Sequence, residues 1–249
     1  MKNFLSIAAS DNSGGAGIQK DISVAHDIGL WPLSAITGIT VQNFSRVISV
    51  SPVLPSLLEQ QIAECLASFD VSAIKIGAIC SEENVDVIAK CLSNCSVKHI
   101  VLDPVIASTS GKLFLTERAI GVLRERIFPL TELITPNKPE FELLTNTPLH
   151  SLDEAIDIAK TKTQEWNTSI LLKGGHFTDS TIREALVTSS ETFLHEHPRV
   201  NFTYQHGTGC TLSSAIACFL GKGESLNSAY LKATDYLVGH YIGCEVSSD

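Results

Sequence analysis

Apolar runs of strand length alternate with amphipathic helical stretches along almost the whole chain. Several of these runs are apolar at nearly every position, which is typical of strands covered on both faces. We predict strands over residues 4–9, 33–41, 73–79, 99–103, 132–135, 169–173 and 200–204. Helices are predicted near residues 15–28, 55–67, 82–93, 116–127, 137–145, 151–165, 210–220 and 225–242. This alternation predicts an α/β fold with a mostly parallel central sheet and helices on both of its faces.

The chain is expected to form one domain. No Pro-, Gly- or Ser-rich linker divides it, and no period of about 20–50 residues repeats along it. Residues 176–203 are the least regular part, with short polar strand-like pieces and three of the eight histidines. We therefore predict a single domain over residues 1–249.

Composition and charge narrow the possible partners. The 249 residues are 44% hydrophobic, which excludes disorder as the dominant state. A formal net charge of −9, without clusters of Lys and Arg, makes nucleic acid and anionic membranes poor electrostatic partners. We find no apolar run of about 18 residues and no secretory leader, and the seven cysteines lack a regular spacing. These features predict a cytoplasmic protein with reduced thiols.

Ligands of an open parallel sheet bind beyond the carboxyl ends of its strands, and the sequence places unusual residues there. After the first strand, residues 10–17 read SDNSGGAG and open the first helix. The glycines allow a ligand to approach closely, and the helix start supplies unpaired N–H donors. The spacing fits neither a dinucleotide-binding motif nor a P-loop. The alternative is a glycine-rich turn in which Asp11 is a local cap.

Two further strand ends carry candidate metal ligands. Asp103 ends the fourth strand-like run, where a carboxylate can hold a metal ion through water or can begin a turn with Pro104. Asn137 and Glu140 are three residues apart, so they share one face at the start of a helix. They can help to place Mg²⁺, or they can form a capping box with Asn137 as the N-cap. The spacing alone does not separate these alternatives.

Candidate anion-binding groups end the strand predicted at residues 169–173 and open a late helix. Lys173 precedes two glycines, which suits a phosphate, although an ordinary surface lysine is the alternative. Gly-Thr-Gly at residues 207–209 predicts an anion hole of backbone N–H groups. Cys210 follows in the first helical turn, where a positive helix end lowers a thiol pKa from its usual value of about 8.5. We predict a thiolate that acts as general base or stabilises an adjacent hydroxyl.

The order of these clusters resembles the hydroxymethylpyrimidine/phosphomethylpyrimidine kinases of thiamine biosynthesis, a family of the ribokinase-like superfamily. The resemblance covers roughly residues 3–242, and the motifs that carry it are SDxSGGAGIQ, KIG, VLDPV, TPNxPE, LLKGGH and HGTGCTLSSAIA. Most ribokinase-like sugar kinases have aspartate after the last glycine of the final motif, whereas the pyrimidine kinases have cysteine, as here at Cys210. The resemblance implies a three-layer α/β/α fold, a homodimer, and ATP and Mg²⁺ as cofactors.

The resemblance also implies a reaction and a set of site residues. The reaction is ATP-dependent phosphorylation of 4-amino-5-hydroxymethyl-2-methylpyrimidine and then of its monophosphate, which gives the pyrophosphate. The residues expected to bind the pyrimidine are Ser13, Gly15, Ala16, Gly17, Thr40, Gln42, Ala78 and Ala107. Those expected to bind the ATP phosphates are Lys173, Gly207, Thr208 and Gly209, with Lys173 and Cys210 as catalytic residues. Those expected to organise Mg²⁺ are Asp103, Asn137 and Glu140.

Departures from the family pattern fall on the substrate wall. Family members usually have methionine at the position of Ala78, valine at that of Ala107 and an apolar residue at that of Thr40. The two alanines enlarge the pocket and remove apolar contact, at about 0.8 kcal/mol per methylene. A pyridoxal or pyridoxine kinase on the same scaffold is therefore an alternative, since a wider pocket admits a bulkier pyridine. A non-catalytic sensor that binds a vitamin precursor is a third hypothesis.

Overall fold

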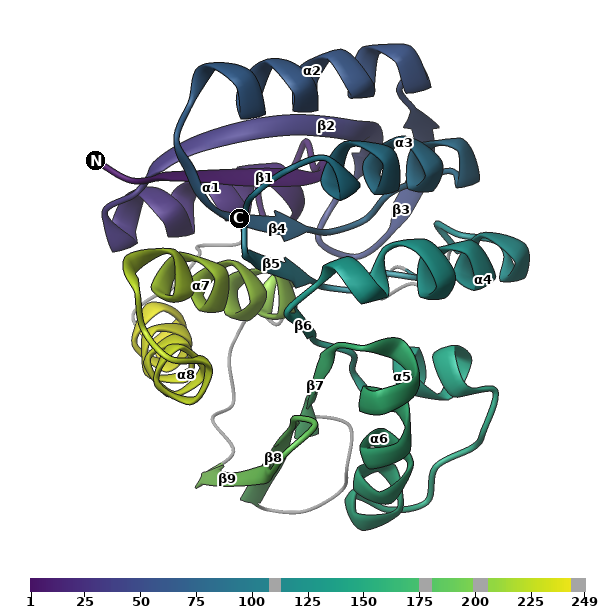
Figure 1. Ribbon diagram of the computed structural model, residues 1–249, viewed down its shortest axis with the longest axis vertical. Helices are drawn as coiled ribbons and strands as arrows, with labels where there is room; N and C mark the ends of the chain where they lie inside the picture. Colours follow the sequence, from purple (N-terminus) through teal and green to yellow (C-terminus); the bar gives the residue numbers. More distant parts are fainter. Residues whose placement is uncertain (108–112, 175–180, 199–205, 243–249) are drawn as a thin grey trace.

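The computed structural model describes residues 1–107, 113–174, 181–198 and 206–242, and within these ranges nine strands form one sheet (Figure 1). The order of the strands across the sheet is β3-β2-β1-β4-β5-β6-β7-β8-β9. Their bounds are β1 Asn3–Ser10, β2 Trp31–Gln42, β3 Val47–Pro52, β4 Val71–Ile76, β5 His99–Leu102, β6 Leu133–Ile134, β7 Ser169–Leu172, β8 Thr181–Val187 and β9 Thr192–Pro198.

Parallel pairing runs through the centre of the sheet. Strand β1 pairs in parallel with both β2 and β4, and parallel pairing continues through β5 and β6 to β7. Antiparallel pairs occur at the edges, between β2 and β3 and among β7, β8 and β9. The predicted, mostly parallel sheet is therefore confirmed. Because the central strands share one direction, the polar clusters that follow them meet at one edge of the sheet.

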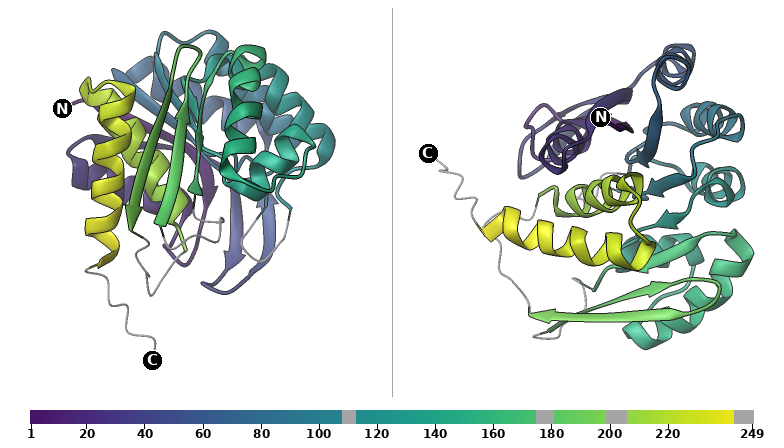
Figure 2. Two further views of the ribbon diagram at one scale, coloured as in Figure 1. Left: turned by 90° about the horizontal axis from the view of Figure 1, so that it is seen from below. Right: turned by 60° about the vertical axis from the view of Figure 1, so that its left-hand side comes forward.

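Helices cover both faces of the sheet and complete three layers (Figures 1 and 2). Their bounds are α1 Gly17–Ile28, α2 Pro55–Ser68, α3 Glu82–Ser93, α4 Glu117–Arg126, α5 Lys138–Thr145, α6 Leu152–Trp166, α7 Thr208–Lys222 and α8 Leu226–Ile242, with a 3₁₀ turn η1 at Phe128–Leu130. Helices α2 to α6 pack on one face, and α1, α7 and α8 pack on the other. None of the helices in the described ranges has the length and apolarity that crossing a bilayer requires.

The sheet separates two apolar cores, and β1 contributes to both. Leu5 and Ile7 join the core beneath α2 to α6, whereas Phe4 points to the core shared with α7 and α8. All three side chains are fully buried, because neighbouring residues of a strand take opposite faces and both faces are covered. This double burial is why the first run is apolar at nearly every position.

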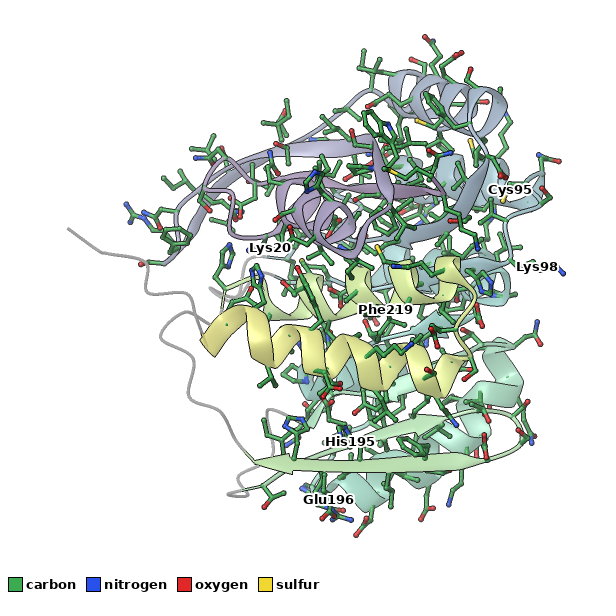
Figure 3. All side chains as sticks on the ribbon, turned by 90° about the vertical axis from the view of Figure 1, so that its left-hand side faces the viewer. Lys20, Cys95, Lys98, His195, Glu196 and Phe219 are labelled. Atoms are coloured by element: carbon green, nitrogen blue, oxygen red, sulfur yellow. The ribbon has the colours of Figure 1, made fainter. Side chains whose placement is uncertain are left out.

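The β8–β9 hairpin lies beyond α8 and shows the same alternation in a more polar form. His195 of β9 faces α8, with its Nδ1 atom 3.2 Å from the hydroxyl of Tyr230, while Glu196 points to the other side (Figure 3). Tyr230 in turn donates to the buried carboxylate of Glu184 on β8 at 2.7 Å. These hydrogen bonds attach the hairpin to α8 together with apolar contacts of Leu186 and Phe193 with the core on that side.

The edge strands are the main departure from the prediction. The sequence pattern omits β3, because most of its six residues are exposed and it lacks a continuous apolar run. Strands β8 and β9 lie within the segment 176–203 that the sequence marks only as irregular. The strand predicted at residues 200–204 lies outside the described residues. Helix α1 begins at Gly17 rather than at residue 15, since Gly17 itself has a positive φ of 59°.

Candidate active site

A cleft of about 810 Å³ opens beyond the carboxyl ends of the central strands. Its walls come from the turn after β1, the β2–β3 turn and the starts of α5 and α7. The predicted site residues that line it are Ala16, Gly17, Thr40, Gln42, Ala78, Asp103, Ala107, Asn137, Glu140, Lys173, Gly207, Thr208, Gly209 and Cys210. The structure thus brings together residues from both ends of the chain.

Two of the predicted substrate-binding residues, Ser13 and Gly15, are not part of this lining. The hydroxyl of Ser13 instead donates to Asp11 at 2.7 Å. Gly15 lies under His206, where an added Cβ would come within 2.5 Å of the ring atom Cδ2. Both residues shape the turn after β1 rather than the wall of the cleft.

Asp11 organises that turn. One of its oxygens accepts the N–H of Ser13 at 2.8 Å, and the other accepts the N–H of Ala16 at 2.9 Å. The second oxygen also lies 3.0 Å from Nε2 of His206. Burial alone raises the pKa of Asp11, but the bonds from His206 and Ser13 outweigh it and hold the pKa well below the ordinary range. Asp11 therefore holds the glycine-rich turn together, whereas α1 itself has no side-chain cap at its N-cap residue Ala16.

A lysine lies between two buried carboxylates on the far side of the cleft. Lys173, just after β7, has its Nζ atom 3.0 Å from Asp103 and 3.7 Å from Glu140. Burial raises the pKa of Asp103, yet Lys173 and Lys75 together hold it below its ordinary value. Burial, together with the charge of Asp103, raises the pKa of Glu140 to about 7 even though Lys173 opposes the shift. Lys173 is therefore no ordinary surface lysine.

Asn137 and Glu140 form the capping box that their spacing allows. The side-chain oxygen of Asn137 accepts the N–H of Glu140 at 2.9 Å, and a carboxylate oxygen of Glu140 accepts the N–H of Asn137 at 2.8 Å. These bonds satisfy donors at the start of α5 and fix the Glu140 carboxylate beside Lys173. Asn137 and Glu140 therefore have a structural role as a capping box, and both residues also line the cleft.

The start of α7 faces the same cluster. Gly207 is the N-cap with φ of 83°, and its backbone is pressed so closely against Gly15 that an added Cβ would lie 1.9 Å from the Gly15 carbonyl oxygen. A Cβ on Gly209 would lie 3.4 Å from Nζ of Lys173 and 3.6 Å from Asp103. The glycine therefore keeps a space between the positive helix start and the lysine, which is the arrangement of an anion hole.

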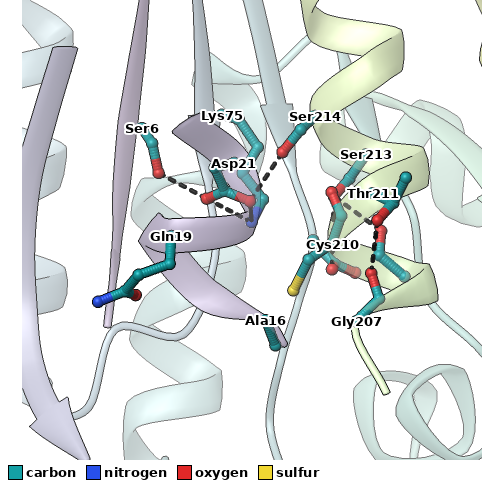
Figure 4. Close-up of polar contacts among 12 residues, drawn as sticks. Ser6, Ala16, Gln19, Asp21, Lys75, Gly207, Cys210, Thr211, Ser213 and Ser214 are labelled. Carbon is teal, nitrogen blue, oxygen red and sulfur yellow. Dashed lines mark hydrogen bonds and ion pairs between the residues drawn. The ribbon is translucent and has the colours of Figure 1, made fainter. Parts of the chain in front are cut away.

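The structure corrects the expected state of Cys210. The residue lies in the first turn of α7 as predicted (Figure 4). Its sulfur accepts the N–H of Gly17 at the start of α1. Burial nevertheless raises the pKa of the thiol to about 11, although Lys75 acts to lower it. The free energy lost by removing a charged sulfur from water is larger than the stabilisation that the helix start and Lys75 provide. The predicted lowering of the thiol pKa is therefore wrong for this structure, in which burial favours the neutral thiol.

A fully buried ion pair, absent from the predicted site, lies close to Cys210 (Figure 4). Lys75 of β4 donates to both carboxylate oxygens of Asp21 on α1 at 2.9 Å. The same carboxylate accepts bonds from Ser6 of β1 at 2.5 Å and Ser214 of α7 at 2.8 Å. Burial lowers the pKa of Lys75, but Asp21 more than compensates and keeps the ammonium charged.

The sequence carries a signal for this pair. Lys75 is a lone charge in the apolar run 73–79, and Asp21 is buried on the apolar face of the first helix with Ile18 and Ala25. A charge at a core position requires a partner, because an unpaired charge is costly to bury. A lysine at one core position and an aspartate at another, in different elements, therefore predict a buried ion pair between them. Arg46 and His206 also line the cleft and are likewise absent from the predicted site.

The fold is a mostly parallel sheet between two helical layers, and a helix start and a lysine–carboxylate cluster lie beyond its strand ends. This combination is that of the ribokinase-like kinases. The chain belongs to the phosphomethylpyrimidine kinase family, whose model matches residues 11–244. The predicted fold class and family are thereby confirmed, and the family is one of phosphotransferases.

Relatives of known function span nearly the whole chain. It is 33% identical over 241 residues to the hydroxymethylpyrimidine/phosphomethylpyrimidine kinase of Haemophilus influenzae, covering 95% of this chain and 90% of that protein. The crystal structure of a phosphomethylpyrimidine kinase from Clostridium difficile is 32% identical, with a TM-score of 0.85 and coverage of 96% and 99%. A Bacillus subtilis pyridoxal kinase in complex with ADP is 28% identical, with a TM-score of 0.86 and coverage of 95% and 90%.

Lys75→Met is expected to destabilise the protein by about 3–5 kcal/mol, because it leaves the Asp21 carboxylate charged and buried without its partner. Urea unfolding followed by circular dichroism measures this loss. The double variant Asp21→Asn/Lys75→Met removes both charges and is expected to recover most of the stability. Lys90→Met, which breaks an exposed pair with Glu59, is the matched control and should cost less than about 1 kcal/mol. A loss at Lys75 no larger than at Lys90 would contradict the interpretation.

Proposed function

We propose that this protein is an ATP-dependent kinase that phosphorylates 4-amino-5-hydroxymethyl-2-methylpyrimidine and then its monophosphate in thiamine biosynthesis. The observation that carries the proposal is the meeting of the Gly207–Cys210 helix start with Lys173 and Asp103 in one cleft of a chain from the phosphomethylpyrimidine kinase family. Phosphoryl transfer requires positioning and charge neutralisation more than covalent help, and these groups supply both. Residues 1–249 act as a single domain.

The phosphates of ATP bind between α7 and β7 in this proposal. Backbone N–H groups of Gly207, Thr208 and Gly209 point from the helix start, where the helix dipole favours an anion. Lys173 supplies the cation from the opposite wall. Its ammonium already has a fixed position between Asp103 and Glu140, so little reorganisation is needed when the phosphates arrive.

The carboxylates fit Mg²⁺ only as an ion shared with the nucleotide. Among the described residues, no three His, Cys, Asp or Glu side chains gather into a metal site. Mg²⁺ usually binds through one or two carboxylates together with substrate phosphates, and Asp103 and Glu140 offer two. Asn137 holds Glu140 in place through the capping box. The ion, when bound, supplies charge neutralisation on the phosphates.

The pyrimidine binds at the other end of the cleft, near β1, β2 and β4. Thr40 uses its hydroxyl to donate to the carbonyl of Ser10 at 2.9 Å, so a polar residue is satisfied where the family usually has an apolar one. Gln42 has a carboxamide to offer the ring nitrogens, and Ala16 and Gly17 form the adjacent backbone wall. Ala78 and Ala107 complete a wide pocket.

Cys210 acts as a neutral thiol in this mechanism. It lies at the meeting point of the starts of α1 and α7, where the hydroxymethyl group must sit to face the anion hole. A loose phosphoryl-transfer transition state leaves the attacking hydroxyl with its proton until late, so a strong base is not required. The thiol orients the hydroxyl by a hydrogen bond, and Lys75 favours negative charge on the attacking oxygen. The hydroxyl proton passes to an oxygen of the transferred phosphoryl group as the new O–P bond forms and ADP leaves.

Cys210→Ala is expected to lower kcat by about 10²-fold, because the attacking hydroxyl loses the hydrogen bond that orients it. A phosphorus NMR time course with ATP, Mg²⁺ and the hydroxymethylpyrimidine measures both phosphorylation steps. Cys91→Ala, a change at a partly buried cysteine of α3 outside the cleft, should retain wild-type turnover. If Cys210→Ala stays within twofold of wild type, the proposed role of the thiol is wrong.

A pyridoxal kinase is the alternative function, and the width of the pocket at Ala78 and Ala107 favours it. We expect kcat/KM for the hydroxymethylpyrimidine to exceed that for pyridoxal when the two compete at equal concentration. Ala78→Met narrows the pocket, so it should raise this ratio further by removing room for the bulkier ring. The competition is read from the two phosphorylated products. A larger kcat/KM for pyridoxal in the wild type would replace the proposed substrate.

The expected homodimer is proposed to form through the β2–β3 edge of the sheet. Ile39 and Val41 of β2 and Ile48 of β3 are 55%, 51% and 55% exposed, an unusual cluster of apolar side chains on one hairpin. Val41→Glu should therefore shift the protein from dimer to monomer in light scattering. Leu194→Glu, at the opposite edge of the sheet and 49% exposed, should leave the dimer intact. A monomeric wild type would refute the proposal.

Free thiols support a cytoplasmic setting for this kinase. The free cysteines among the described residues are Cys65, Cys80, Cys91, Cys95, Cys210 and Cys218. Reduced thiols persist in the cytoplasm, where thiol buffers prevent disulfide formation.

A further inference from the structure

The basic side chains that line the cleft differ in whether a carboxylate pairs with them. Lys75 is paired with Asp21, Lys173 with Asp103, and His206 with Asp11. Arg46, in the turn between β2 and β3, lines the same cleft, and no carboxylate of the described residues pairs with it. It is thus a cation that is free to bind an anion entering the cleft.

The turn that carries Arg46 is held in place. The side-chain oxygen of Asn43 accepts the N–H groups of Ser45 and Arg46, both at 3.0 Å, and the N–H of Asn43 donates to the carbonyl of Arg46 at 3.1 Å. The N–H of Gln42 donates to the side chain of Asn12 at 2.8 Å, which ties the end of β2 to the turn after β1. The backbone of Arg46 therefore has a fixed position at the cleft.

An aromatic contact brings this turn to the anion hole. The ring of Phe44 meets that of His206 edge to face, with 6.1 Å between centroids and an interplanar angle of 73°. His206 directly precedes Gly207, the N-cap of α7. Gly15 makes the approach possible, since an added Cβ there would come within 2.9 Å of the Phe44 ring. Arg46 thus lies two residues after Phe44, whose ring contacts His206, the residue before the helix start of the proposed anion hole.

The second phosphorylation poses a charge problem that the first does not. Its acceptor is a phosphate monoester, which carries up to two negative charges into a cleft that already holds Asp11 and Asp103. Lys173 is engaged by two carboxylates and, in the proposed function, by the nucleotide. A dianion buried beside carboxylates needs a cation of its own, and a guanidinium matches a phosphate with two parallel N–H bonds.

We propose that Arg46 binds the phosphate group of the monophosphorylated substrate and selects that substrate for the second phosphorylation. This inference rests on the proposed function and names a specificity residue within it. The guanidinium holds the oxygens of the ester phosphate that do not react, and leaves the attacking oxygen directed toward the nucleotide. The alcohol substrate has no such group, so Arg46 discriminates between the two acceptors.

The test is Arg46→Gln, assayed separately with the hydroxymethylpyrimidine and with its monophosphate as the starting acceptor. The ratio of kcat/KM for the monophosphate to that for the alcohol is expected to fall at least tenfold, mainly through KM for the monophosphate. Arg46→Lys keeps the charge and should recover part of the ratio. Inorganic phosphate should compete with the monophosphate in the wild type and compete less well in Arg46→Gln. Arg118→Gln, on α4 and 83% exposed, is the matched control and should keep the wild-type ratio.

The outcomes separate the inference from the function on which it rests. A wild type that phosphorylates both acceptors while Arg46→Gln lowers both kcat/KM values equally would overturn the role of Arg46 and leave the kinase intact. An unchanged ratio with unchanged rates would overturn it in the same way. A wild type that phosphorylates neither acceptor would refute the proposed function first, and the inference with it.

Discussion

One buried ion pair, between Lys75 and Asp21, joins the elements that build the cleft. The lysine comes from β4 and the carboxylate from α1, while Ser6 of β1 and Ser214 of α7 complete its hydrogen bonds. A buried pair adds little stability over a well-packed apolar alternative, so its importance lies elsewhere. A shift of α1 along the sheet would leave both charges unpaired in the interior, and a shift of α7 would remove the Ser214 hydrogen bond from the Asp21 carboxylate. We infer that the pair and its hydrogen bonds fix the relative positions of the two helix starts.

Within the cleft the same physics produces a site that is ordered in advance. Lys173 is held by Asp103 and Glu140, and His206 by Asp11, so the polar groups need not be recruited from solvent. Preorganised dipoles and charges are the most effective means of stabilising the charge that moves in phosphoryl transfer. The desolvation that such a site requires also explains why the Cys210 thiol keeps its proton: the environment that strengthens the ion pairs penalises an isolated thiolate.

The sequence predicts most of this architecture because buried parallel strands leave a strong apolar signal, and because ligand groups follow such strands. It fails where structure depends on tertiary contact. Strand β3 is exposed and its pattern is weak, so pairing with β2 rather than local preference defines it. The helix-start effect on Cys210 can be read from glycine spacing, whereas the burial that outweighs it cannot. Lys75 is visible as a charge in an apolar run, but its partner lies 54 residues away.

The contacts that close the cleft span nearly the full length of the chain. Asp11 and His206 are 195 residues apart, and Asp21 and Ser214 are 193 apart. Closing such long loops costs entropy that only the completed contacts repay, so these contacts are intrinsically slow to form. During synthesis from the N-terminus, β1 and α1 cannot make these contacts until almost the entire chain has been made and α7 can dock. The candidate site is thus assembled at the end of folding, and a chain that stops short of α7 lacks both the helix start that the cleft needs and the cover of one face of the sheet.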